Sequence, residues 1–270
     1  MNATLFSAAV AALALLPLTA QAQTTIIASD NASSAAYGGT GYAGLNGGTG
    51  FGAFNVVTTG AAGTFEYTSK ESEDGSANID SPAVTAGGSP LSFGLYAQTP
   101  GSATTITRSF NAGPTAGDTF SLDFVTGYND GANGSGMSGV SLTDAAGAFG
   151  TFSYQSNDQY LFNGATITGQ GYTSGALHLV YDITSATTYS LSVTGPFSFS
   201  GTGTFAGPVT GFQVAQTNSG STNPAHNAYF NNLSETAPAS AAPEPSQIGV
   251  LLIVCLGVVA AAARKRAAHA

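Results

Sequence analysis

Thr119-Phe120-Ser121-Leu122-Asp123-Phe124-Val125 alternates apolar and polar side chains with almost no interruption. Successive side chains of an extended strand point to opposite faces, so Phe120, Leu122 and Phe124 share one face and the polar residues share the other. A strand of this kind covers a core with one face and meets solvent with the other. The stretch therefore predicts an amphipathic strand in an antiparallel sheet.

The same period-two pattern recurs along the chain, with turn residues between the runs. Glycine accounts for 36 of 270 residues, which disfavours helices. Between residues 23 and 240 no apolar stripe has the helical period of 3.6. Residues 30–50 are predicted to be loop or a weakly paired edge. The further runs are Thr64–Tyr67, Leu91–Tyr96, Leu177–Ile183, Tyr189–Val193, Val209–Val214 and Ala228–Leu233. We expect an all-β antiparallel β-sandwich.

The charge of the chain is strongly one-sided. Three of its five Lys and Arg residues are the consecutive Arg264, Lys265 and Arg266, which leaves Lys70 and Arg108 beside the fourteen acids of the chain. Such a surface repels nucleic acid, so a nucleic-acid partner is not expected. It suits an extracellular setting rich in divalent cations.

The N-terminus reads as a signal peptide, residues 1–22. An apolar core, Leu5–Leu18, precedes the small-x-small triplet Ala20-Gln21-Ala22, which predicts cleavage after Ala22. The first four residues carry no Lys or Arg, so an uncleaved anchor is the alternative.

The C-terminus reads as a membrane anchor. Ile248–Ala263 is a run of uncharged residues, about 24 Å long as a helix, followed by the basic cluster 264–266. The cations would hold the tail 264–270 in the cytoplasm. A buried C-terminal helix of a globular fold is the alternative. The only cysteine, Cys255, lies in this run, so no disulfide is expected in the exported domain.

Pro243-Glu244-Pro245, the apolar run and Arg264-Lys265-Arg266 together resemble the PEP-CTERM sorting signal. The resemblance implies a Gram-negative bacterium and an exosortase-type enzyme that processes the tail at the inner membrane. It further implies delivery to the cell surface or to an extracellular polysaccharide matrix. The exported domain would span 23–237, with a Pro/Ala linker and the motif at 238–247 and the transmembrane helix at 248–263.

A second resemblance concerns the fold. Ser92–Ala97, Arg108–Phe110 and Gly117–Phe124 look like a sandwich domain found in other proteins with this signal. Ala228–Leu233 is similar to the closing strand of concanavalin-like jelly rolls and carbohydrate-binding modules. The implied fold is a jelly-roll or concanavalin-like sandwich.

One segment offers ligands for calcium. Tyr128–Gly134 follows a predicted strand and contains Asn129, Asp130 and Asn133, whose side-chain oxygens suit Ca²⁺. The full EF-hand spacing with its terminal Glu is absent. The alternative is an ordinary turn, because Asn, Asp and Gly are also turn residues.

No catalytic residues are predicted, and we expect no enzyme activity. His178 and Asp182 share a strand face but lie about 13 Å apart, too far for a direct acid–base couple. No nucleophile elbow, metalloprotease helix or P-loop occurs. Closely spaced acids could supply a glycosidase pair, but most of them fall in a polar stretch that reads as a solvated loop. These acids are Glu66, Glu71, Glu73, Asp74 and Asp80.

The expected function is structural or adhesive, at the surface or in the matrix. The alternatives are a lectin-like module that binds glycan or calcium and, third, a polysaccharide-active enzyme. An aromatic platform for sugar rings would have to come from tyrosines, because the chain has no Trp. These tyrosines could equally be core residues, and the sequence identifies no glycan-binding set. They are Tyr128, Tyr154, Tyr160, Tyr172 and Tyr229.

Overall fold

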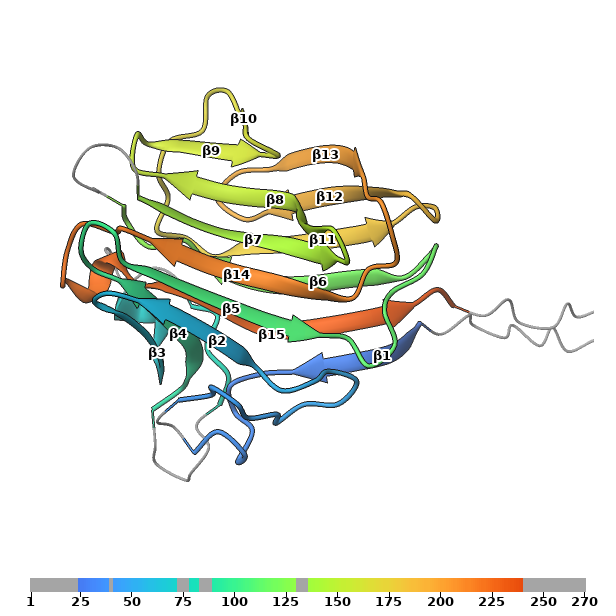
Figure 1. Cartoon of the computed structure of the whole chain (residues 1–270), viewed down its shortest axis with the longest axis horizontal. Coiled ribbons are helices and arrows are strands. Elements are labelled where there is room, and N and C mark those ends of the chain that lie inside the picture. The colour runs from blue at the N-terminus through green and yellow to red at the C-terminus, as the bar shows by residue number, and fades with distance from the viewer. Residues whose placement is uncertain (1–23, 39–40, 72–77, 83–88, 130–135, 240–270) are drawn as a thin grey trace, which may run out of the picture. The chain divides into compact units, whose positions relative to one another are not determined.

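The computed structural model describes residues 24–38, 41–71, 78–82, 89–129 and 136–239. Within them, two antiparallel sheets stack face to face (Figure 1), which confirms the predicted all-β antiparallel sandwich. Thr25–Pro238 form one compact unit. Among the described residues, no helix is long and apolar enough to cross a membrane. The predicted signal peptide, PEP motif, transmembrane helix and basic tail lie outside these residues.

An eight-stranded sheet has the order β13-β12-β11-β6-β15-β4-β3, with β1 also paired to β15, and a seven-stranded sheet has the order β10-β9-β8-β7-β14-β5-β2. The strands of the first are β1 (Thr25–Asp30), β3 (Ala62–Tyr67), β4 (Ser92–Ala97), β6 (Thr119–Val125), β11 (Leu177–Ile183), β12 (Thr188–Thr194), β13 (Phe199–Thr204) and β15 (Ala228–Ala237). The strands of the second are β2 (Asn55–Thr59), β5 (Ala103–Ser109), β7 (Met137–Asp144), β8 (Gly147–Gln155), β9 (Gln159–Phe162), β10 (Ala165–Thr166) and β14 (Gly211–Thr217). Two short 3₁₀ turns are η1 (Ser69–Glu71) and η2 (Pro224–His226).

The alternation in β6 sets its two faces as predicted. Phe120, Leu122 and Phe124 are fully buried in the core between the sheets, while the intervening polar residues are partly exposed. Leu122 lies opposite Leu179 of the neighbouring β11, so apolar residues from adjacent strands meet on the inner face. Burial of these side chains is the main force that holds the sheets together.

The predicted loop over residues 30–50 is largely turns where it is described, but it also fills the core. Tyr37 and Tyr42 are at most 2% exposed and pack against Phe93 with ring centroids 5.1 and 4.9 Å apart. The Tyr42 hydroxyl donates a hydrogen bond to the Gly94 carbonyl at 2.9 Å. The loop therefore closes one part of the sandwich with aromatic rings.

Asn231 marks the point where β15 changes partners, from β4 to β1. The side chain is fully buried. Its Nδ2 donates to the Ile79 and Leu91 carbonyls and to Ser81 Oγ, and its Oδ1 accepts from the Ala32 N–H at 3.0 Å. One amide thus satisfies backbone groups that the gap between the two partner strands would leave unpaired.

Candidate functional site

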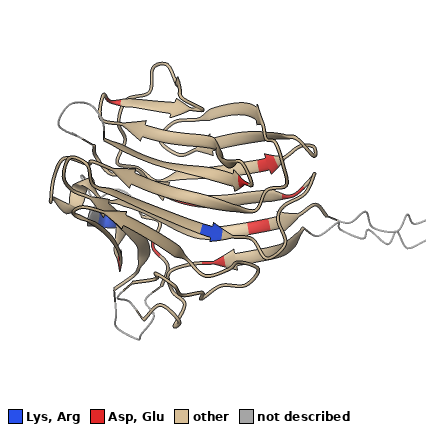
Figure 2. Cartoon of the chain, viewed as in Figure 1, with Lys and Arg blue, Asp and Glu red and all other residues tan. Residues whose placement is uncertain are grey.

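The outer face of the seven-stranded sheet is free of acidic and basic side chains. Arg108 and Asp144 are the only acidic or basic residues in its strands (Figure 2). Arg108 points inward and is 1% exposed. Asp144 ends β7, where its carboxylate accepts backbone N–H groups of the two loops at 145–147 and 206–207. Neither residue places a charge on the outer face.

The outward positions of this sheet are uncharged, and one row of them across four strands carries hydroxyl and amide groups. This row consists of Asn55 in β2, Thr107 in β5, Gln213 in β14 and Ser141 in β7, and each residue lies opposite the next. Adjacent strands are about 4.8 Å apart. Hydroxyl and carboxamide groups both donate and accept hydrogen bonds. The next row, formed by Val57, Thr105, Ala215 and Gly139, is mostly apolar. The face therefore combines neutral hydrogen-bonding groups with uncharged apolar positions.

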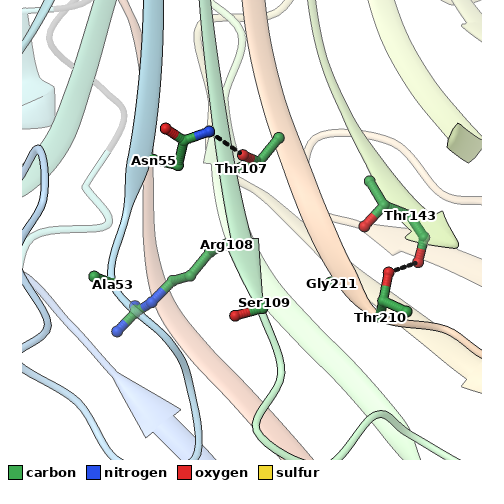
Figure 3. A pocket seen from close by; sticks show the side chains of 8 residues that line it. All are labelled: Ala53, Asn55, Thr107, Arg108, Ser109, Thr143, Thr210 and Gly211. Carbon is green, nitrogen blue, oxygen red and sulfur yellow. Dashed lines mark hydrogen bonds between the residues drawn. The ribbon is translucent and has the colours of Figure 1, made fainter. Parts of the chain in front are cut away.

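A pocket of about 270 Å³ lies on this face (Figure 3). Asn55 Nδ2 donates to Thr107 Oγ1 at 3.2 Å on one side of the pocket, and Thr210 Oγ1 donates to the Thr143 carbonyl at 3.2 Å on the other. The volume lies just below the roughly 300–1,000 Å³ typical of small-molecule sites. The lining residues are Ala53, Asn55, Thr107, Arg108, Ser109, Thr143, Thr210 and Gly211.

Gly211 keeps the floor of this pocket open. A Cβ at this position would lie 2.4 Å from the Arg108 carbonyl oxygen and 3.1 Å from Thr143 Oγ1. The backbone oxygen cannot move aside easily, so only glycine fits without a shift of the strands.

Arg108 lines the pocket, but its charge is held on the inner side of the sheet. Its Nη1 lies 2.5 Å from Asp30 Oδ2, and its Nε donates to the Gly52 carbonyl at 2.8 Å. The guanidinium carbon lies 4.7 and 4.1 Å from the ring centroids of Phe51 and Phe54. Arg108, one of the two cations outside the basic tail, therefore adds no positive charge to the surface. Taking the guanidinium out of water costs free energy, which the ion pair with Asp30, the hydrogen bonds and the two aromatic rings offset.

Tyr37 completes this buried group. Its hydroxyl donates to Asp30 Oδ2 and accepts from the Gly47 N–H at 2.8 Å. Burial, followed by the hydrogen bond to Asp30, raises the pKa of the Tyr37 hydroxyl well above its usual value. The group is structural. Because Arg108 is buried in it, Lys70 is the only exposed Lys or Arg among the described residues.

Of the three predicted calcium ligands, the structure describes only Asn129, which is fully buried. Its Nδ2 donates to Ser138 Oγ at 3.3 Å, while its Oδ1 accepts no hydrogen bond from the described residues. Asp130 and Asn133 lie outside these residues. The described part of the chain contains no group of three or more His, Cys, Asp or Glu residues that could hold a metal. Calcium binding at this loop stays a prediction.

The tyrosines do not form a platform on the neutral face. Tyr154, Tyr160 and Tyr229 are fully buried, as expected for core residues, and burial raises the pKa of Tyr160 to about 12. Tyr128 and Tyr172 are partly exposed and pack edge to face at 5.1 Å, but they lie in loops. None of these tyrosines is therefore placed to stack against a sugar ring bound on the outer face of the seven-stranded sheet.

The candidate acids are dispersed. Glu66 is 4% exposed within β3, whereas Asp80 accepts hydrogen bonds from Thr68 and Ser69. The Glu71 side chain, Glu73 and Asp74 lie outside the described residues. Glu66 lies in the predicted run Thr64–Tyr67, outside the stretch predicted as a solvated loop, and β3 turns its side chain inward.

His178 is half exposed, as expected for a surface residue, and its partner comes from the neighbouring strand. Its Nδ1 lies 2.7 Å from Asp123 Oδ1, and this hydrogen bond raises the pKa of the imidazole. Asn232 Nδ2 donates to the other Asp123 oxygen at 2.7 Å. Asp182 instead accepts from Ser190 at 3.3 Å. This group lies on the outer face of the eight-stranded sheet.

The pocket on the outer face of the seven-stranded sheet was not predicted from the sequence. Three of its strands, β2, β5 and β7, lie outside the predicted runs, although Thr105-Ile106-Thr107 of β5 has the β-branched alternation that favours a strand. That pattern was the available signal.

No family model matches the chain, and no curated protein matches it. Among solved structures, the chain is similar to a CBM2 module of the evolved Dit of Lactobacillus casei BL23 phage J-1, with 13% identity, a TM-score of 0.40, and coverage of 70% of this chain and 92% of that one. It is also similar to lectin I-B4 from Griffonia simplicifolia, with 9% identity, a TM-score of 0.32, and coverage of 67% and 92%. A third is an alginate lyase from Corynebacterium sp., with 10% identity, a TM-score of 0.36, and coverage of 64% and 75%. Similarities of this size assign neither a ligand nor an activity.

Proposed function

We propose that this is an exported, non-enzymatic protein of the cell surface or matrix that adheres to a neutral polysaccharide through the outer face of its seven-stranded sheet. The observation that carries the proposal is the complete lack of charge on this face in a chain with fourteen acids. Sugar hydroxyls donate and accept hydrogen bonds, as do the Thr, Ser, Asn and Gln side chains that they would meet.

Neutral side chains also favour this ligand on energetic grounds. Removing hydroxyls and amides from water costs less than removing ionised groups, provided that new hydrogen bonds form. Each such bond contributes about 0.5–1.5 kcal/mol, so a single sugar unit binds weakly. A long polymer that contacts several rows and several copies gains by multivalency. This is the behaviour of an adhesive matrix protein.

The route to the surface is part of the same proposal. Residues 1–22 direct export, Ile248–Ala263 anchors the chain transiently in the inner membrane, and Pro243-Glu244-Pro245 is processed by an exosortase-type enzyme. The sandwich is then a concanavalin-like jelly roll delivered to the matrix. Replacing Pro243 and Pro245 with Ala should leave the chain in the membrane fraction of its host. Release of this variant as efficient as wild type would contradict the sorting role.

The binding surface is tested by removing single hydroxyls. Thr107→Val and Thr143→Val keep the shape of the side chain, and each should weaken co-sedimentation of the exported protein with the host's neutral polysaccharide by about 3- to 10-fold. The matched control is Thr194→Val, which removes an exposed hydroxyl from β12 on the other sheet. Equal weakening by the control, or no weakening by either pocket variant, would contradict the assignment.

A further inference from the structure

Strand β2 ends the seven-stranded sheet and pairs on one side only. All five of its residues are in register with β5, from Asn55 opposite Thr107 to Thr59 opposite Ala103. Within the described residues, no backbone hydrogen bond joins β2 to any strand or loop on its other side. Its outer edge therefore presents backbone N–H and C=O groups that can pair with another strand.

Phe54, directly before the strand, exchanges backbone hydrogen bonds with Gly44 and Leu45, so the open edge begins at Asn55. From there on the strand lacks the sequence features by which proteins usually block strand addition. The sequence Asn55–Thr59 contains no charged residue and no proline, and its pairing with β5 has no bulge. Val57, at the centre, is 58% exposed. Among the other edges, β1 is interrupted by a register shift and β10 has only two residues. Edge strand β13 is also regular and free of charge and proline, but unlike β2 it carries no exposed large apolar side chain. An uncharged, regular edge with an exposed valine is a site for pairing with another chain.

The strand is complementary to itself. If two copies pair antiparallel about a two-fold axis at Val57, Val57 faces Val57 and Asn55 faces Thr59, so every cross-strand pair is neutral. The chain carries a formal net charge of −9, so contact between copies meets least repulsion where both surfaces are uncharged. We propose that two copies of this protein associate through β2, which joins their seven-stranded sheets into one continuous antiparallel sheet.

The contact is small and therefore weak. Five residues a side bury far less than the roughly 800 Å² per partner of a stable interface. Pairing is thus expected where the protein is concentrated, as on a cell surface. It does not depend on glycan binding, but it would set two neutral faces edge to edge and double the surface offered to a polymer.

The test is cross-linking of the full-length protein on intact cells of its host. Val57→Cys is placed in a Cys255→Ser chain, so that the new thiol is the only one. A short bismaleimide should then give a covalent dimer on denaturing gels. Two controls carry the thiol elsewhere: Thr105→Cys, opposite Val57 but one strand further in, and Thr202→Cys, exposed on edge strand β13. A yield at Val57 at least fivefold above both controls is expected, and equal yields would overturn the proposal.

A charge exchange tests the register. Added to Val57→Cys, the pair Asn55→Glu and Thr59→Glu places like charges opposite each other and should abolish most of the dimer. The pair Asn55→Glu and Thr59→Lys places opposite charges there and should restore it. Circular dichroism of each variant checks that the sandwich is intact. Equal yields from the two pairs would show that β2 does not pair with itself.

Discussion

The two sheets differ most on the faces that they turn to solvent. The eight-stranded sheet carries the His178–Asp123 pair and Asp182, and part of its outer face is covered by an apolar cluster around Tyr229 and Ile79. The seven-stranded sheet carries no charge on its outer face and holds its one arginine inside. Asp144 is the only acid in the strands of that sheet, and it lies at the end of β7. The difference points to a neutral partner for one face only.

The largest expected effect comes from breaking the inward ion pair of the seven-stranded sheet. Arg108→Met leaves Asp30 buried without its cation, which should lower the free energy of unfolding by about 3–5 kcal/mol in urea titrations. The double variant Asp30→Asn, Arg108→Met removes both charges and should recover much of the loss. A double variant no more stable than Arg108→Met would contradict this account.

The next effect comes from giving the neutral face a charge like that of the other sheet. Thr107→Glu forces a carboxylate to lose water when the polymer binds, so affinity for a neutral polysaccharide should fall by about 2 kcal/mol, or roughly 30-fold. Thr194→Glu on β12 adds the same charge to the opposite sheet and should leave affinity nearly unchanged. If the two variants bind equally, the faces do not differ in function.

Buried Glu235 contrasts with the paired Arg108. Neither of its carboxylate oxygens has a hydrogen-bond partner among the described residues, and burial, with a contribution from Asp118, raises its pKa to about 7. The folded state then holds a proton that the unfolded state releases above its ordinary pKa of 4.5, so stability should fall as pH rises from about 4.5 to 7. Glu235→Gln should flatten this dependence and stabilise the protein at pH 8 by about 1 kcal/mol, after allowance for partial solvation. An unchanged pH dependence would show that another group titrates.

The smallest effect belongs to the exposed pair on the eight-stranded sheet. Because the raised pKa favours protonated His178 in the folded state, its stabilisation is complete below pH 6.5 and is lost as pH rises through the folded pKa. Since the pair is exposed, Asp123→Asn should cost about 0.5 kcal/mol or less. An NMR titration should show the His178 pKa returning toward its ordinary value in Asp123→Asn. A pKa that does not move would mean that Asp123 is not its cause.

Local pattern was enough to predict the strands with strong alternation. β6, β11 and β12 appear where period-two runs place them, because each buries large apolar residues on one face only. The burial of Tyr154, Tyr160 and Tyr229 was likewise one of two alternatives that the sequence left open.

Features set by long-range contacts could not be predicted in this way. Arg108 and Asp30 lie 78 positions apart, and nothing local shows that they meet. β6 lies beside β15, the last strand, although about a hundred residues separate them. The neutral face depends on which strands are neighbours, so it became visible only with the sheet order. β2 was not predicted because Val56 is the only one of its five residues that is even partly buried, so its sequence shows little apolar alternation.

The central claim is that the outer face of the seven-stranded sheet binds neutral polysaccharide, and backbone NMR of the exported protein tests it most directly. Oligosaccharides prepared from the host's neutral polysaccharide, and anionic oligosaccharides of equal length, would be titrated in turn. The account predicts that the neutral ligand shifts amide signals of Asn55, Thr107, Thr143 and Gly211, with no shifts around His178, and that the anionic ligand has little effect. Shifts centred on the eight-stranded sheet, or a response to the anionic ligand alone, would contradict it.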